Sequence, residues 1–162
     1  MKILGKLKIS SRYIRSMTID CLALDIVAFD LFVGGIHADE SNLTIDVYEE
    51  KLSASLLSLA IAVRTLIYQD VYNLHKFQNV DYCGFYESDN PKDKASVTIK
   101  DICDKLIHAD SIERELEETE KVDHKPITKI IGTNNGKQWI LEISVSLFCE
   151  SVLNWINTIN NA

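Results

Sequence analysis

Apolar residues recur at intervals of three and four in four stretches of the chain, which is the spacing of one buried face of a helix. The four stretches cover roughly residues 10–33, 48–74, 98–109 and 146–160. Gly34-Gly35 ends the first stretch, and the hydroxyl of Thr98 can cap the amide of Asp101 at the start of the third. The pattern therefore predicts a bundle of about four helices.

The period changes to two in the C-terminal third of the chain. Residues 126–131 and 137–145 are β-prone, and the second run alternates apolar and polar positions around Trp139 and Leu141. Asn135-Gly136 between them is a strong signal for a β-hairpin. Because an isolated hairpin is marginally stable in water, it must dock on the helices or pair with another strand.

The fold class predicted is mainly α (α+β), with the hairpin placed before the C-terminal helix. The length of 162 residues fits a single domain over 1–162. Three segments connect the elements: a turn-rich stretch at 37–46, a loop at 77–96 and a charged run from Glu113 to Asp123, where regular packing ends. Val80 to Tyr86 within the loop could form a short strand.

Composition narrows the class of partner. The net charge of −7 disfavours binding of nucleic acid by the whole surface and suits a basic protein partner. The four cysteines form no C-x-x-C pair, so we expect reduced thiols in a cytoplasmic protein. Asp20, Asp25 and Asp30 interrupt the first apolar stretch, which argues against a signal peptide and a membrane span. The motifs indicate no cofactor and no metal.

His108 is the first candidate for chemistry. Asp104 and Asp101 precede it by four and seven residues, so the three share a face of the predicted helix. A carboxylate one turn from an imidazole can set its tautomer and raise its pKa, which suits general acid–base catalysis. The alternative is a partly buried histidine that is held by Asp104 and contributes packing alone.

The run from Cys103 to His108 resembles the motif of the HEPN family, compact helical bundles of which many are ribonucleases. In that motif an arginine precedes the histidine, commonly with a polar residue between them. His108 matches the histidine and Asp104 the polar position, whereas Cys103 stands in place of the arginine. A thiol cannot supply the cationic fork that acts on the phosphate. The resemblance therefore implies a bundle without that group, one that could pair with itself.

Arg64 lies within an apolar part of the second predicted helix. A buried unpaired charge is costly, so the side chain should find an acid, with Asp104, Asp101, Asp25 and Asp30 as the candidates. A structural ion pair is one interpretation. The other is that Arg64, or Lys105 on the third helix, replaces the missing arginine beside His108.

An acidic run provides the best candidate for a binding surface. Its acids are Glu113, Glu115, Glu117, Glu118 and Glu120. Tyr82, Phe85 and Tyr86 could be aromatic anchors beside them, since interface cores favour such residues. A solvated, charged end of a helix is the plainer interpretation.

Three functions remain open. The first is a non-enzymatic cytoplasmic domain of the bacterial immunity or antitoxin type, which resembles this chain in size and acidity and would neutralise a basic nuclease toxin. The second is a HEPN-like domain that binds or cleaves RNA through His108. The third is a scaffold, a homodimer for example, held together by the broad apolar first helix.

Overall fold

The structure is a computed structural model, and it describes residues 9–32, 42–69, 84–88, 95–114 and 127–160. Four helices lie in these ranges: α1 (Ser11–Phe32), α2 (Asn42–Tyr68), α3 (Ile99–Ile107) and α4 (Val145–Asn160). Five strands accompany them: β1 (Gly84–Ser88), β2 (Ala95–Val97), β3 (Ser111–Arg114), β4 (Ile127–Asn134) and β5 (Lys137–Ser144). The prediction of a mainly helical α+β fold is confirmed.

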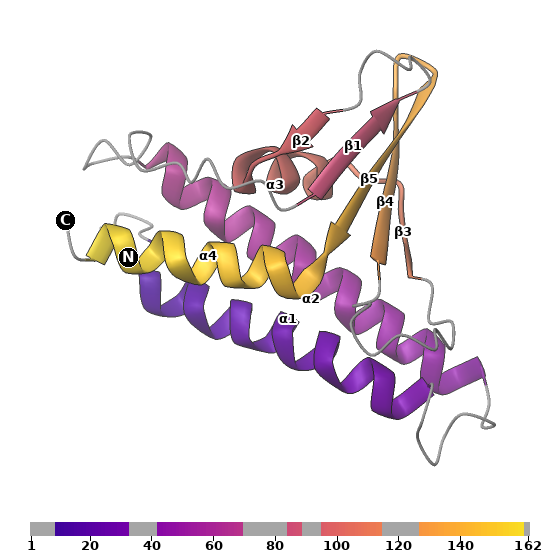
Figure 1. The fold of residues 1–162 in the computed structure, drawn as a ribbon, viewed down its shortest axis with the longest axis horizontal. Coiled ribbons are helices and arrows are strands. Elements are labelled where there is room, and N and C mark those ends of the chain that lie inside the picture. The colour runs from indigo at the N-terminus through magenta and orange to yellow at the C-terminus, as the bar shows by residue number, and fades with distance from the viewer. Residues whose placement is uncertain (1–8, 33–41, 70–83, 89–94, 115–126, 161–162) are drawn as a thin grey trace, which may run out of the picture.

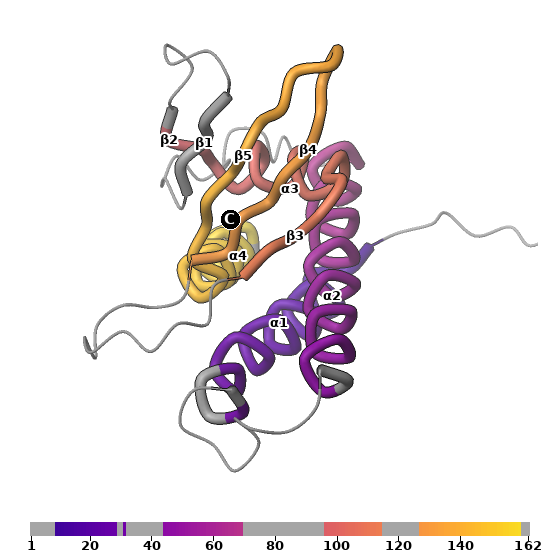
Figure 2. Tube along the Cα trace, turned by 90° about the vertical axis from the view of Figure 1, so that its right-hand side faces the viewer, coloured from indigo at the N-terminus to yellow at the C-terminus, as the bar shows by residue number. Residues whose placement is uncertain are grey.

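The helices form one part of the molecule and the sheet another. α1 packs against α2 and α4, and α2 also packs against α3. The strands form one antiparallel sheet in the order β2-β1-β5-β4-β3. Figure 1 shows this sheet rising from the start of α4, with α3 beside it. In Figure 2, α2 runs along the outside of the molecule and α1 crosses it.

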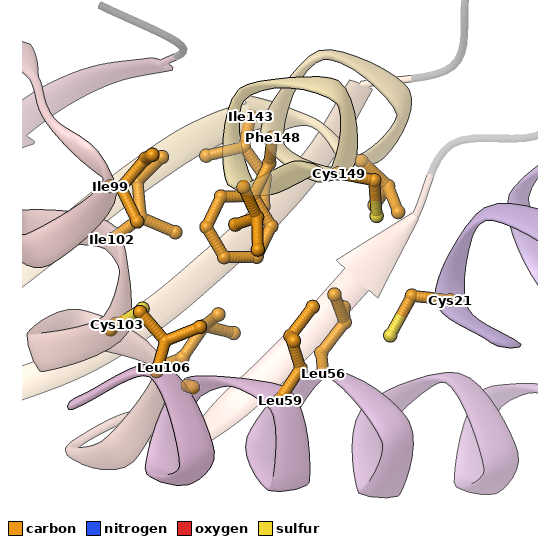
Figure 3. Packing of buried hydrophobic residues seen from close by; sticks show 14 of the residues in the cluster. Cys21, Leu56, Leu59, Ile99, Ile102, Cys103, Leu106, Ile143, Phe148 and Cys149 are labelled. Atoms are coloured by element: carbon orange, nitrogen blue, oxygen red, sulfur yellow. The ribbon is translucent and has the colours of Figure 1, made fainter. Parts of the chain in front are cut away.

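The core lies where α3, α4 and the hairpin meet α1 and α2. Phe148 of α4 is fully buried, and Figure 3 places its ring between Ile102 of α3 and Leu56 and Leu59 of α2. Leu141 and Ile143 cover this cluster from β5, as the alternation in the sequence predicts. Burying a side chain of this size contributes roughly 1.5–3 kcal/mol, so this cluster accounts for much of the driving force for folding.

Two local predictions are confirmed in detail. Thr98 caps α3: its hydroxyl accepts the N–H of Asp101, and the Asp101 carboxylate accepts the N–H of Thr98. At the hairpin, Asn135 and Gly136 have φ of 51° and 76°. Both residues therefore adopt the left-handed conformation that a tight two-residue hairpin turn requires.

The structure corrects the boundaries of the second helix. α2 begins at Asn42, within the stretch expected to be turn-rich, rather than at Tyr48. Ile45 and Val47 are exposed, whereas Tyr48 is buried. The first turns thus add little to the apolar pattern, which is why the pattern starts late. The predicted end at Leu74 lies outside the described residues.

The hairpin does not stand alone. β5 pairs with β1 on one side, and β4 pairs with β3 on the other. The start of the charged run is therefore a strand, because Glu113 and Arg114 pair with Lys129 and Thr128. This corrects the expectation that regular packing ends at Glu113.

Gly132 provides a test of the hairpin packing. It faces Trp139 across the strands, and a Cβ at Gly132 would lie 2.1 Å from Cζ2 of that ring. We expect Gly132→Ala to lower the free energy of unfolding by about 1–3 kcal/mol, measured by urea denaturation, because the ring must move. Lys137→Ala, an exposed change in the same hairpin, should stay within about 0.5 kcal/mol. A Gly132→Ala variant as stable as the parent would contradict this packing.

Candidate functional site

The carboxylate of Asp104 in α3 pairs with two cationic side chains. Its Oδ1 lies 2.5 Å from Nη1 of Arg64, and its Oδ2 accepts a hydrogen bond of 3.1 Å from Lys100. Arg64 also donates to the hydroxyl of Tyr68, with its guanidinium 5.1 Å from the centre of that ring. The hydrogen bond to Tyr68 and the charge of Asp104 raise the pKa of Arg64, and the bond to Asp104 raises the pKa of Lys100. The structural ion pair predicted for Arg64 is therefore present, and Asp104 is its partner.

His108 is exposed at the C-terminal end of α3. Its backbone N–H donates to the carbonyl of Lys105, and the residue is the C-cap, with φ of −109° and ψ of 14°. The alternative of a partly buried histidine is therefore wrong, because the helix ends one residue before it. The carboxylate of Asp101 caps the N-terminal end of α3, so it does not orient the imidazole of His108 at the other end.

Cys103 and Lys105 both have structural roles in the described part of the chain. Cys103, which stands at the position of the family arginine, is fully buried in the core. The ammonium of Lys105 lies 4.3 Å from the ring centre of Trp139, a cation–π arrangement. Asp104, Lys105 and His108 thus lie in the last turn and at the C-cap of α3, and Arg64 reaches Asp104 from α2. Arg64, Asp104 and Lys105 are all engaged in structural contacts.

Part of the predicted binding surface falls on the described strands. Glu113 is exposed on β3, which is an edge strand of the sheet. Phe85 and Tyr86 belong to β1, where they pair with Glu142 and Leu141 of β5. The remaining candidates, Tyr82, Glu115, Glu117, Glu118 and Glu120, lie outside the described residues.

A buried polar cluster is the feature that the sequence did not reveal. The Asp25 carboxylate on α1 accepts hydrogen bonds from Arg114 at the end of β3 and from the hydroxyl of Ser146 in α4. The side chains of Arg114 and Asp25 are 3% and 4% exposed. Nε and Nη1 of Arg114 are buried without a hydrogen-bond partner among the described residues. The three residues join α1, the sheet edge and α4 at one point.

Tyr48 completes this region. Its ring is buried, and its hydroxyl donates to the carbonyl of Leu24. Burial raises the pKa of Tyr48 to about 12, with Arg114 opposing the rise and Asp25 adding to it. Tyr48 is therefore a neutral hydrogen-bond donor at physiological pH.

The periodicity of α1 did hold a signal for this cluster. Asp25 falls in register with Ile14, Thr18, Cys21 and Ala28, all of which are buried. A carboxylate at a core position of a helix requires a cationic or hydroxyl partner. The sequence could not identify that partner, because Arg114 lies 89 residues away inside a charged run.

Two thiols lie beside the cluster. Cys21 of α1 and Cys149 of α4 are free and fully buried, and Figure 3 shows them at the same end of the hydrophobic cluster. A hydrogen bond with Cys21 and burial both raise the pKa of the Cys149 thiol. Since a thiolate is the nucleophilic form, Cys149 is a packing residue rather than a reactive one.

The described residues contain no group of three or more His, Cys, Asp or Glu side chains placed to hold a metal ion. Comparison of the chain with protein-family models, with curated proteins and with solved structures finds no match.

The Asp25–Arg114 pair should be far more important for stability than the Arg64–Asp104 pair. Arg114→Met leaves the Asp25 carboxylate buried without its cation, and we expect a loss of about 3–5 kcal/mol in the free energy of unfolding. Arg64→Met, the matched control at a more exposed pair, should cost about 1 kcal/mol or less. Urea denaturation measures both. The double variant Asp25→Asn/Arg114→Met should be more stable than Arg114→Met alone, and a double variant that is less stable would contradict this coupling.

Tyr48 should make the fold sensitive to alkali. Its folded-state pKa of about 12 exceeds the ordinary value of 10.0, so the unfolded chain loses this proton first as the pH rises. Stability contributed by the neutral phenol is complete below pH 10 and is lost between pH 10 and 12, by about 2–3 kcal/mol. Urea denaturation at pH 9 to 12 should show a shallower decline for Tyr48→Phe than for the parent. Equal slopes would contradict the assignment to Tyr48.

Proposed function

We propose that the chain is a non-enzymatic, cytoplasmic protein-binding domain of the immunity or antitoxin type, which covers a basic partner such as a nuclease toxin. The distribution of charge between the interior and the surface carries this proposal. The net charge of −7 is a sum over the whole chain, whereas the structure gives the exposure of most charged side chains in the described ranges.

The exposed charges of the described residues are mostly carboxylates. The exposed acids are Asp20, Asp46, Glu49, Glu50, Asp101, Asp110, Glu113 and Glu150. The exposed cations are Arg12, Lys51 and Lys137. Among the exposed side chains of the described residues, acids therefore outnumber cations, and this surface would attract a basic partner and speed its association.

The other described cations are at most partly exposed, and most of them contact another side chain. Arg64 and Lys100 bind Asp104, and Arg114 binds Asp25. Arg15 donates to Asn157, and Lys105 lies over Trp139. Each of these contacts joins two elements or closes a helix turn. The side chain of Arg114 is nearly fully buried, whereas those of Arg64 and Lys100 are 26% and 34% exposed, so the fold engages part of its positive charge in contacts.

Glu113 supports a contact role for the acidic run. It is exposed on an edge strand, where a partner can approach without displacing another element. The acids that follow it in sequence extend the same charge. Phe85, Tyr86 and Tyr82 remain predictions as aromatic anchors.

The HEPN-like alternative rests on His108. Its exposed imidazole is accessible to an RNA, and Lys105 and Asp104 lie on the same helix. Against this, each of the neighbouring charged groups already has a partner within the fold. The immunity-type function is therefore the proposal, and RNA binding or cleavage is the competing one.

A capture experiment separates these functions. The tagged chain, incubated with a lysate of the source organism, should retain one basic protein in near-stoichiometric amount, and added salt should weaken the complex. Replacing Glu113, Glu115, Glu117, Glu118 and Glu120 by lysine should abolish retention, because the contact becomes repulsive. His108→Ala is the matched control and should retain the partner. RNA that copurifies without a protein, and is cleaved by the parent but not by His108→Ala, would overturn the proposal.

A further inference from the structure

α2 has an apolar stripe on the side that faces away from the core. Val47, Leu57, Ile61 and Tyr68 are 45%, 40%, 48% and 64% exposed, and Ala54 is exposed between them. The spacing of seven, four and three places all five on one face of the helix. We call this set the outer face of α2. Leu52, Leu56 and Leu59 form the opposite, buried face.

Two open grooves run along the outer face, one on each side of Ala54. The groove toward α1 has a volume of about 320 Å³ and is lined by Tyr13, Met17, Asp20 and Ser58. The groove toward α3 and β3 has a volume of about 260 Å³ and is lined by Leu57, Leu106, Asp110 and Ile112. Ala54 belongs to both, and its small side chain leaves the ridge between them low.

This shape suits a helix. A helix that lies along a ridge places side chains at intervals of three and four into the grooves on either side. Each groove offers apolar wall and one carboxylate, so a matching helix carries an apolar stripe with cations at its borders.

The charges around the outer face of α2 favour a basic occupant over a second copy of the chain or an anionic bilayer. Asp20 lies in one groove, Asp110 in the other, and Glu50 is exposed on the same side of α2. Two cations of α2 lie beside this face: Arg64 is already paired with Asp104, and Lys51, four residues after Val47, is exposed. The three carboxylates outnumber this lysine. A second copy of the chain would bring like charges together, and an anionic bilayer surface would be repelled. A basic occupant gains from all three carboxylates.

We propose that the outer face of α2 binds an amphipathic basic helix of the partner protein. This inference rests on the proposed function and deepens it, because it names a docking surface in addition to the acidic run. The apolar stripe from Ala54 to Tyr68 supplies the desolvated centre of the contact, and Asp20 and Asp110 supply its charged border. Glu50 lies on the face itself, three residues after Val47.

A membrane is the competing occupant. Among the described helices, the segment Thr44–Tyr68 is long and apolar enough to cross a bilayer by length and composition. Its buried face packs on α1 and α3 here, so only the outer face is left for a lipid surface. The carboxylates along both grooves favour the basic helix, and vesicles are included in the test.

The probe is a synthetic three-heptad helical peptide with Leu at the a and d positions and Lys elsewhere. We expect it to bind the parent chain, and Leu57→Gln/Ile61→Gln to weaken binding about tenfold or more, as measured by fluorescence anisotropy. Ile127→Gln/Leu147→Gln is the matched control, with changes at positions 51% and 48% exposed but outside the outer face, and should bind like the parent. Both variants change exposed side chains, so their melting temperatures should match the parent.

The same peptide with Glu in place of Lys should bind at least tenfold more weakly, and equal binding of the two would overturn the charge argument.

If the Lys peptide binds both double variants equally, the docking surface is wrong and the proposed function stands. The same holds if the Lys peptide fails to bind while the capture experiment still yields a basic protein. If neither experiment yields a basic ligand, the proposed function fails as well. Binding to phosphatidylcholine or phosphatidylglycerol vesicles, or a dimer in sedimentation equilibrium, that is lost in Leu57→Gln/Ile61→Gln would overturn the basic helix as occupant.

Discussion

The contact between Asp25 and Arg114 is the constraint on which the arrangement of the molecule depends. Apolar contacts between a helix and a sheet tolerate small shifts, because dispersion is not directional. A guanidinium and a carboxylate that are both removed from water tolerate very little, since a displaced partner leaves a buried charge. Asp25 also accepts from Ser146, 121 residues further along the chain. One carboxylate therefore fixes the first helix, the edge of the sheet and the start of the last helix together.

This internal use of charge also shapes the surface. Arg114, Arg64 and Lys100 lie against carboxylates within the fold, and two carboxylates suffice for the three of them. Asp104 accepts two cations at once. These pairs engage three cations with two carboxylates, so they leave an excess of acids among the remaining charges. The acidic exterior is a consequence of how the fold is held together as well as of composition.

The sequence predicts the elements whose signals are local. The Thr98 cap, the Asn135-Gly136 turn and the alternation around Leu141 need only neighbouring residues, and all three are as predicted. β3 and the Asp25–Arg114 pair depend on segments far apart in the chain. Residue type at Arg114 suggested a solvated charge, because charge runs usually are solvated, and only the pairing of β3 with β4 buries it. Arg64 lies between these cases: its need for an acid was predictable, whereas the choice of Asp104 among four acids required the packing of α2 on α3.

The position of Cys103 bears on both candidate functions. It is fully buried on the face of α3 that also carries Ile102 and Leu106. An arginine at this position would place a charge in the core, where it would need a carboxylate that the surrounding apolar side chains do not supply. Cys103 is therefore a packing residue of α3. The polar side chains of this region lie elsewhere: Asp104 pairs with Arg64, and His108 is exposed to solvent. The packing of α3 therefore leaves the exposed acids of the described residues as the feature that the proposed basic partner would contact.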